Sequence, residues 1–556
     1  MCMLFKLVLL YLWVHWVNQG SDFVTGRSGN VTSGTVFVNG TASIGKTDDN
    51  FICATLDWWA PNKCDYGTCS WERSSLLNLD LSNPILLNAI KAFSPLKIRM
   101  GGTLQDKVIY ETKDDKSPCA PFVKNSSEMF GFSKGCLPMS RWDQLNVFFK
   151  KAGAMVVFGL NALNGKTIGS DGSATGAWNS SNAESLIRYT VNKGYSIHGW
   201  ELGNELCGTG VGAKVAPDQY ASDVKSLENI VQNIYRGFEV KPLVIAPGGF
   251  IDTNWFAQFI QRTPKSLQVV TQHIYNLGPG NDNQLINNIL DPSYLDGGAQ
   301  PFRDLEAILK NSATPAVAWV GEAGGAYNSG QNLVTNSFVN AFWYLGQLGM
   351  ASSYDTKTYC RQTLIGGNYG LLDTATFVPN PDYYGPHQVN GSRVGTYDIG
   401  NNCHIAYSLS RNDLKVRGHR LGRLGYQKNV LSTSFSGTTG VRAYAHCSKQ
   451  SQGISLLLIN FNANISVNVR VVTDGEQAPR VKLGNTSREE YHFTAKDENL
   501  HSQKVVLNGK ILALNSSGGI PPMEPVNRSM TDPIIVAPFS YVFSHISSII
   551  LPACIN

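Results

Sequence analysis

The chain has 556 residues, enough for one large or two medium-sized domains with their own hydrophobic cores. Hydrophobic residues make up 42% and charged residues only 16%, the composition of a globular protein with few surface charges. A net charge of +5, without a dense stripe of Lys and Arg, argues against nucleic-acid binding. It is compatible with an acidic polysaccharide partner.

Residues 1–20 have the pattern of a secretory signal peptide. Lys6 precedes an apolar run, Leu7–Val14, that is too short for a membrane span. We therefore expect a secreted, extracellular protein. A vacuole or lysosome, with peripheral association with its membrane, is the alternative. Near the other end, residues 534–551 are apolar but interrupted by Pro538 and His545, which favours strands over a membrane anchor.

From residue 48 on, short apolar runs alternate with amphipathic stretches, the pattern of buried parallel strands joined by helices. Seven or eight such units predict an α/β fold, a (β/α)8 TIM barrel spanning residues 48–427. The strands are expected within Leu96–Met100, Ala154–Leu160, Leu243–Ala246, Leu267–Val270 and Ala316–Val320, and the helices within Ser185–Lys193, Gln219–Tyr235, Trp255–Gln261 and Phe302–Lys310.

Two glutamates end apolar runs directly before glycine-rich stretches. Glu205 ends the segment Gly199–Glu205, and Glu322 ends Ala318–Glu322. Catalytic groups of barrel enzymes sit at the carboxyl ends of strands. Enzymes that cleave glycosidic bonds use two carboxyl groups, one as proton donor and one as nucleophile or base. A glutamate beside glycine can also be a solvated loop residue, but the pair in this context predicts a glycosidase.

A nucleophilic Glu322 needs a cation or hydrogen-bond donors nearby to remain ionised. Arg99, on an early strand, and Tyr275, in the segment His273–Tyr275, are candidates. A buried structural salt bridge is the alternative for Arg99, and packing at the barrel rim is the alternative for His273 and Tyr275. Glu201, inside the strand before Glu205, is interpreted as structural.

From about residue 428 the pattern changes to alternating short strands, which predicts a C-terminal antiparallel β-sandwich at 428–556. Residues 21–47 contain one strand-like segment, Gly34–Val38, expected to join it. Asn-X-Ser/Thr sequons predict glycosylation at Asn30, Asn39, Asn125, Asn179, Asn390, Asn464, Asn485, Asn515 and Asn527. Candidate disulfides in an oxidising compartment are Cys64–Cys69, Cys119–Cys136 and Cys447–Cys554. The cysteines lack zinc-site spacing, and we expect no metal and no cofactor.

Several motifs in this order resemble glycoside hydrolase family 79, and most closely its plant heparanase-like members. They are Asp57 after an apolar run, the turn Arg99–Thr103, Trp200–Glu205, His273–Tyr275, Trp319–Glu322 and Gly366–Tyr369. The resemblance covers nearly the whole mature chain. It implies a retaining β-glucuronidase on a (β/α)8 barrel with a C-terminal β-sandwich.

The resemblance also assigns roles to residues. Glu205 would be the acid/base and Glu322 the nucleophile, and the supporting role of Arg99 rests on the reasoning given above. Gly367 and Tyr369 would bind the uronic carboxylate, and Asp57, Thr103, Asn204 and Tyr327 would contact sugar hydroxyls. His273 and Tyr275 are further candidate substrate-binding residues.

Two segments depart from the family pattern. The stretch Lys107–Arg141 is short and holds two cysteines, which argues against maturation by excision of a linker. After Tyr384, where the family continues into the last barrel helix, residues 385–427 are rich in Gly, Asn and Arg with little periodicity. A retained intron or a genuine surface insertion would explain them, and we expect low order there.

We therefore predict a monomeric retaining β-glucuronidase of the cell wall that acts on glucuronic acid-bearing polysaccharides or proteoglycans, such as arabinogalactan proteins. A retaining barrel glycosidase with a neutral substrate is one alternative. A non-catalytic cell-wall protein that binds glycans is the other, favoured by the unusual segment 385–427 and disfavoured by the two intact glutamates.

Overall fold

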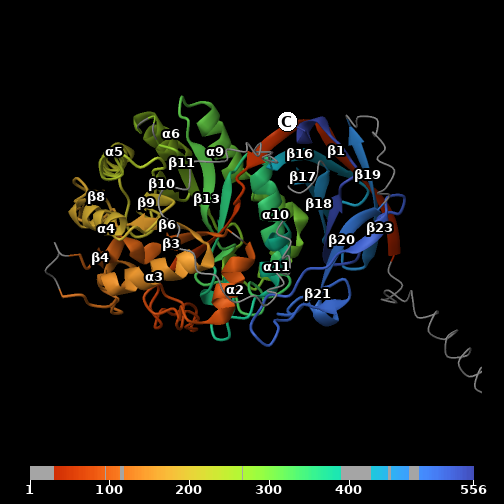
Figure 1. Cartoon of the computed structure of the whole chain (residues 1–556), viewed down its shortest axis with the longest axis horizontal. Coiled ribbons are helices and arrows are strands. Elements are labelled where there is room, and N and C mark those ends of the chain that lie inside the picture. Colours follow the sequence, from red (N-terminus) through yellow and green to blue (C-terminus); the bar gives the residue numbers. More distant parts are fainter. Residues whose placement is uncertain are drawn as a thin grey trace, which may run out of the picture.

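The computed structural model describes residues 30–389, 428–448, 453–474 and 487–555, except residues 94, 113–117, 264 and 266. The predicted signal peptide and the sequons at Asn390 and Asn485 lie outside the described residues. Two bodies stand side by side, a barrel built from the red-to-green part of the chain and a sheet built mainly from the blue part (Figure 1).

Eight parallel strands close into a barrel, which confirms the predicted fold class. Their order around the barrel is β10-β11-β13-β15-β2-β3-β6-β9. The strands are nearly all buried, so they carry the continuous apolar runs typical of parallel sheets covered by helices. They are β2 (Ile52–Asp57), β3 (Lys97–Gly101), β6 (Met155–Leu160), β9 (Gly199–Leu202), β10 (Leu243–Gly249), β11 (Val269–Ile274), β13 (Val317–Ala323) and β15 (Thr358–Arg361).

A helix follows every barrel strand, which completes eight β/α units. The helices are α2 (Pro84–Phe93), α3 (Met139–Ala152), α4 (Ser181–Asn192), α5 (Pro217–Ile234), α6 (Thr253–Arg262), α9 (Gln300–Lys310), α10 (Asn340–Ser353) and α11 (Pro381–Val389). The short helices α7 (Leu285–Leu290) and α8 (Pro292–Gly297) precede α9. The predicted helical stretches all fall on members of this set.

The last of these helices corrects the expectation of low order from residue 385. The helix α11 begins at Pro381 and continues to Val389, although it contains Pro386. Tyr383 anchors it, because this side chain is fully buried and its hydroxyl donates to the Ala89 carbonyl at 2.8 Å. The eighth barrel helix is therefore present, and only residues 390–427 of the unusual segment lie outside the described residues.

The C-terminal strands and β1 (Asn30–Thr47) form one 11-stranded sheet. Its pairs are antiparallel except for β1 and β19, which run parallel, so the sheet is mixed rather than purely antiparallel as predicted. Its other strands are β16 (Lys428–Ser436), β17 (Val441–Cys447), β18 (Ile454–Asn460), β19 (Ile465–Asp474), β20 (Ser487–Ala495), β21 (Val505–Leu507), β22 (Lys510–Ile511), β23 (Val526–Ser529), β24 (Ile534–Val536) and β25 (Ser540–Ile546).

This sheet curls around a core of its own and packs its other face on the barrel. Side chains of β1, β16–β19, β24 and β25 meet in one apolar cluster, which places strands from distant parts of the sheet face to face. On the barrel side, Tyr541 stacks on Phe338 with ring centroids 5.6 Å apart, and Phe461 lies 5.3 Å from Phe342 on α10. The helices α10 and α11 lie between the two bodies (Figure 1).

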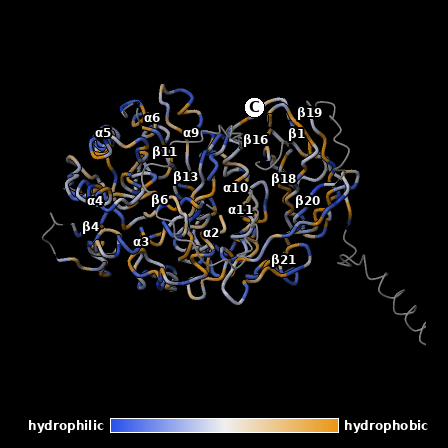
Figure 2. Tube along the Cα trace, in the orientation of Figure 1, coloured by the Kyte–Doolittle hydropathy of each residue, from blue (hydrophilic) through white to orange (hydrophobic). Residues whose placement is uncertain are grey.

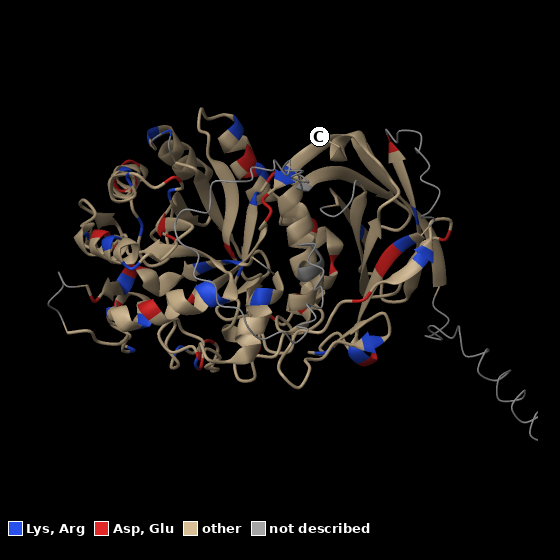
Figure 3. Cartoon of the chain, viewed as in Figure 1, with Lys and Arg blue, Asp and Glu red and all other residues tan. Residues whose placement is uncertain are grey.

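Disulfides, hydropathy and charge complete the description of the fold. The three predicted disulfides are present, and a fourth joins Cys53 to Cys360. Hydrophobic and hydrophilic stretches alternate throughout both bodies (Figure 2), and charges of both signs are scattered over them (Figure 3). Among the described residues, no helix is both long and apolar enough to cross a membrane. The described sequon asparagines are all exposed: Asn30, Asn39, Asn125, Asn179, Asn464, Asn515 and Asn527.

Candidate active site

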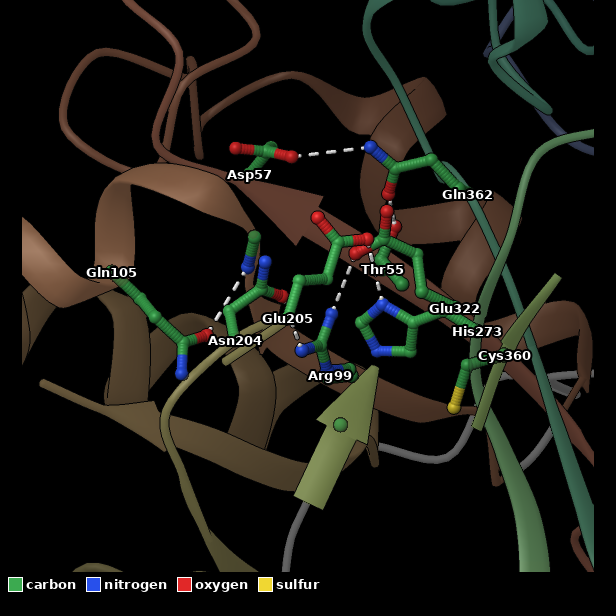
Figure 4. Close-up of polar contacts among 12 residues, drawn as sticks. Thr55, Asp57, Arg99, Gln105, Asn204, Glu205, His273, Glu322, Cys360 and Gln362 are labelled. Atoms are coloured by element: carbon green, nitrogen blue, oxygen red, sulfur yellow. Dashed lines mark hydrogen bonds and ion pairs between the residues drawn. The ribbon is translucent and has the colours of Figure 1, made fainter. Parts of the chain in front are cut away.

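The buried guanidinium of Arg99 joins three polar groups at the mouth of the barrel. Its Nη1 donates to Glu322 at 2.8 Å and its Nη2 to Asn204 Oδ1 at 2.9 Å (Figure 4). Its Nε donates to Glu201 at 2.5 Å. Burial lowers the pKa of Arg99, but Glu201 and Glu322 outweigh this effect and raise it above its usual value. Arg99 is thus both a buried structural salt bridge and the cation beside Glu322, so the two alternatives from the sequence coincide.

Glu322, on β13, has donors on both carboxylate oxygens. Besides Arg99 on Oε2, the Tyr275 hydroxyl donates to Oε1 at 2.6 Å. Burial, followed by the negative charge of Glu322, raises the pKa of Tyr275 well above its usual value, so the phenol keeps its proton. A cation and a fixed hydrogen-bond donor both stabilise negative charge on a carboxylate. Both carboxylate oxygens of Glu322 therefore face groups that stabilise negative charge.

Glu205, just after β9, has the opposite character. Burial raises its pKa to about 7, although Arg99 and a hydrogen bond from Asn204 oppose the shift. Its carboxyl oxygen lies 3.0 Å from His273 Nδ1, and burial lowers the pKa of that imidazole to about 4. Because the two shifts leave both groups uncharged near pH 6, we interpret this contact as a hydrogen bond between neutral groups rather than an ion pair.

The backbone at Glu205 is also unusual. Its φ of 55° lies in the left-handed region, which side chains other than glycine rarely adopt. The Glu205 N–H donates to the Gly248 carbonyl at 2.6 Å, so the end of β10 fixes the turn. Such conformations persist where the surrounding structure holds them, and they occur preferentially at functional sites.

The two glutamates lie close together. One oxygen of Glu205, one oxygen of Glu322 and a ring nitrogen of His273 all lie within 4.8 Å of one another. Retaining glycosidases hold their carboxyl groups about 5–5.5 Å apart, whereas inverting ones need about 6.5–9.5 Å. Two carboxylates and an imidazole can also bind a metal, but the guanidinium bonded to Glu322 already supplies positive charge and disfavours a second cation there.

A second group of polar residues lies at the end of β2 and just after β15. Asp57 accepts from Gln362 Nε2 at 3.1 Å, and the same amide lies 3.5 Å from the Tyr369 hydroxyl. Burial, followed by the charge of Glu322, raises the pKa of Asp57 to about 7. Gly102 has a φ of 102°, and a Cβ there would lie 2.4 Å from the Asp57 carboxylate, so this turn requires glycine.

The remaining predicted residues lie in short elements around the mouth. Thr103 begins the 3-10 helix η1 (Thr103–Lys107), directly after Gly102. Gly367 begins η3 (Gly367–Tyr369), in which Tyr369 is buried. Tyr327 ends the two-residue strand β14 (Ala326–Tyr327) and is 42% exposed at the rim.

Sequence reasoning missed two polar side chains that hold this site together. Gln362 bridges Asp57 and Tyr369, as described above. Asp106, on η1, accepts from the backbone N–H groups of Ala162 at 2.7 Å and Asn204 at 2.8 Å. It therefore ties η1 to the segments after β6 and β9. Neither residue belongs to a recognisable pattern in the sequence, although Asp106 lies shortly after the Arg99–Thr103 turn.

Comparisons with known proteins identify the family. Residues 33–349 match the model described as glycosyl hydrolase family 79, N-terminal domain. Heparanase-like protein 3 of Arabidopsis thaliana is 54% identical over 539 residues, covering 94% of each chain. The chain belongs to glycoside hydrolase family 79. It is therefore a glycoside hydrolase, and the resemblance seen in its motifs is confirmed.

Two further comparisons find proteins that are named as β-glucuronidases. Baicalin-beta-D-glucuronidase of Scutellaria baicalensis is 42% identical and covers 90% of both chains. Among solved structures, a 4-O-alpha-L-rhamnosyl-beta-D-glucuronidase from Fusarium oxysporum aligns over 92% of this chain and 100% of its own with a TM-score of 0.60. At 16% identity, that structural likeness shows the fold alone.

Proposed function

We propose that this family 79 enzyme is a retaining β-glucuronidase. The observation that carries the proposal is the close approach of two carboxyl groups with opposite character, within 4.8 Å. Glu205 is kept protonated by burial, and Glu322 is bonded to a guanidinium and a phenol. A pair of carboxyl groups whose surroundings separate their protonation states is the arrangement that acid and nucleophile require.

The first step breaks the glycosidic bond. The Glu322 carboxylate attacks the anomeric carbon and forms a glycosyl ester, while the bond from that carbon to the leaving oxygen breaks. Glu205 gives its proton to the leaving oxygen, which departs as an alcohol. In the second step, Glu205, now a carboxylate, takes a proton from water. The resulting hydroxide attacks the anomeric carbon and frees Glu322, so the configuration of the sugar is retained.

The choice of a uronic acid rests on the group that follows β2 and β15. Asp57, Gln362 and Tyr369 form a polar cluster beside Glu322, and Gly367 begins the turn that carries the tyrosine. Donors placed for a charged carboxylate remain unpaired when a neutral sugar enters, which costs binding energy. The name of the Scutellaria relative supports the same substrate class. Polysaccharides and proteoglycans that bear glucuronic acid are the substrates that we propose.

We also propose that the protein works outside the cytosol as a secreted glycoprotein. Four disulfides join described cysteines, as expected of a protein from an oxidising compartment. The exposed sequon asparagines leave room for glycans. A vacuolar or lysosomal location agrees with the same observations, and fractionation of a tagged chain distinguishes the two.

The test is hydrolysis of p-nitrophenyl β-glucuronide at mildly acidic pH by the secreted protein. Glu205→Gln and Glu322→Gln should abolish turnover, whereas Glu228→Gln, the same change on the outer helix α5, should not. Free glucuronate should compete and glucose should not. Hydrolysis of a neutral glycoside in preference to the glucuronide would favour a neutral-substrate glycosidase. A folded protein that binds glucuronides without cleaving any would favour a glycan-binding protein.

A further inference from the structure

Phe250 is an exposed aromatic residue beside the buried catalytic groups. It directly follows β10 and is 41% exposed, whereas Glu205 and Glu322 are less than one tenth exposed. Its ring centroid lies 6.1 Å from that of Tyr275 and 6.4 Å from that of His273. These two side chains hold the catalytic carboxyl groups. Single exposed apolar residues are common on proteins, but this one lies against the rings that contact both glutamates.

The order of strands around the barrel places Phe250 opposite the proposed glucuronate-binding residues. In the closed sequence of eight strands, β10 stands four positions from β2 in either direction. Asp57 ends β2, Thr103 follows β3, and Gly367 and Tyr369 follow β15. Most residues assigned to the sugar that is cleaved thus lie in the half of the mouth opposite Phe250, whereas Asn204, which follows β9, lies on the same side as Phe250.

Phe250 also lies on the side of the proton donor. The backbone at Gly249 is so close to the Glu205 turn that a Cβ there would lie 3.1 Å from the Glu205 Cα and 2.5 Å from the Cys207 sulfur. Since β9 and β10 are neighbours and Glu205 protonates the leaving oxygen, the leaving group must extend past this edge of the mouth.

This edge carries exposed apolar side chains and few basic ones. In the loops that follow β9, β10 and β11 (residues 203–216, 250–252 and 275–284), Lys214 is the single basic residue, and it lies 3.8 Å from Asp171. Val211 is 38% exposed, and its N–H donates to the Glu205 carbonyl at 3.0 Å, which fixes it beside the acid. A polyanionic leaving group, such as a sulfated sugar, would find in these loops only Lys214, which is already paired with Asp171. A leaving group with a flat, uncharged surface matches these loops better.

We propose that Phe250 is the platform of the leaving-group subsite and selects uncharged aglycones that have a flat apolar face. The inference rests on the proposed β-glucuronidase function and deepens it. A phenol ring and the apolar face of a neutral sugar ring share this chemistry, because both can lie against an aromatic ring and cover it from water. Phe250 is then a specificity residue, which contributes to reactions whose leaving group reaches it and to no others.

The test compares substrates with and without a leaving group that can reach the platform. Fluoride in β-glucuronyl fluoride is too small to touch Phe250, whereas the coumarin of 4-methylumbelliferyl β-glucuronide is flat and apolar. Phe250→Ala should lower kcat/KM for the coumarin substrate about 10-fold or more, as expected for loss of an apolar contact in the transition state. It should leave kcat/KM for the fluoride within about 2-fold. Phe250→Trp should restore most of the lost activity.

A matched control excludes a general effect of removing an exposed phenylalanine. Phe238 lies before β10, at the opposite end of the same strand, and is 50% exposed. Phe238→Ala should leave kcat/KM for both substrates unchanged. Equal losses on both substrates in Phe250→Ala would overturn the proposal, because they would show that the ring supports the catalytic groups rather than the leaving group. Unchanged activity on both substrates would overturn it as well.

A third substrate identifies the natural leaving group. If a sugar face occupies the platform, Phe250→Ala should lower kcat/KM for a glucuronyl-galactose disaccharide as much as for the coumarin glucuronide. If only phenols occupy it, the decrease for the disaccharide should be smaller. A loss on the fluoride alone would contradict the assignment of the two halves of the mouth. Failure of the unmodified enzyme to cleave glucuronyl fluoride would instead contradict the β-glucuronidase function itself, so the two failures are distinguishable.

Discussion

Arg99→Lys tests whether the guanidinium holds the catalytic pair in place. Lysine keeps the positive charge, but its single ammonium cannot reach Glu201, Glu322 and Asn204 together, which the three nitrogens of Arg99 do at 2.5–2.9 Å. If one of the three contacts survives, two charge-assisted hydrogen bonds are lost at about 1.5–3 kcal/mol each. The total of about 3–6 kcal/mol agrees with the cost of breaking a buried ion pair, about 3–5 kcal/mol.

The interaction energy lost in Arg99→Lys should lower both the stability of the protein and its catalytic activity. We expect a lower midpoint of thermal unfolding and a fall in kcat/KM of about 100- to 1000-fold, the usual effect of removing one preorganised group from an active site. Circular dichroism gives the first quantity and p-nitrophenyl β-glucuronide hydrolysis the second. The matched control is Arg488→Lys, because Arg488 is equally buried and bonded to Glu490 at 2.6 Å in the second sheet. It should lose stability but keep its kcat/KM.

A decrease of less than about 3-fold in the kcat/KM of Arg99→Lys would refute this reasoning, because it would show that Glu322 does not depend on the guanidinium. An equal loss of activity in Arg488→Lys would do so as well, since it would attribute the effect to general destabilisation.

Three further predictions concern other parts of the site. Because burial raises the pKa of Glu205 to about 7 and the first step needs its proton, kcat/KM should fall as pH rises through about 7; a profile still flat at pH 8 would contradict this. The two oxygens of Asp106 each accept a hydrogen bond from a backbone N–H, and the single oxygen of asparagine can replace only one of them. Asp106→Asn should therefore lower the free energy of unfolding in denaturant by about 1–3 kcal/mol. It should also lower kcat with little change in KM, because the backbone of Asn204 is no longer held in place. Replacing Cys53 and Cys360 by serine removes a link across 307 residues between the first and last barrel strands, and should cost about 3–5 kcal/mol of unfolding free energy; an unchanged midpoint of thermal unfolding would contradict it.

Much of the barrel could be predicted because its strands are continuous apolar runs buried on both faces. The exception is β15, whose sequence Thr358-Tyr-Cys-Arg361 is polar and short. Its burial depends on partners that are distant in sequence: Cys360 is bonded to Cys53, and Arg361 donates to Asp382 at 3.0 Å. A local pattern contains no information about such partners, so this strand escapes prediction.

The candidate site also contains some residues that the sequence predicts and others that it does not. Glu205 and Glu322 could be predicted because strand ends are visible in the sequence, and the barrel brings strand ends together. The distance between them, and the bonds of Arg99 to both Glu201 and Glu322, depend on the closed ring of strands. Gln362 and Asp106 have no signature of their own, because their importance lies in bonds to segments from other strands.

The end of the barrel shows the opposite error. Gly385 and Pro386 interrupt the expected helical pattern, so the sequence predicted a break where the structure continues α11 to Val389. Local propensity is a weak guide when tertiary contacts oppose it. Here the buried Tyr383 supplies such contacts, because it packs edge-on against Phe93 of α2 at 5.2 Å.

The central claim is that Glu322 becomes covalently bonded to the sugar during turnover. It is tested most directly by incubating the enzyme with 2-deoxy-2-fluoro-β-glucuronyl fluoride, whose glycosyl-enzyme is hydrolysed slowly, and mapping the added mass by peptide mass spectrometry. The account predicts one added fluoroglucuronyl group, located on the peptide that contains Glu322 and absent in Glu322→Gln. An active enzyme that acquires no label, or that carries it on a residue other than Glu322, would contradict the account.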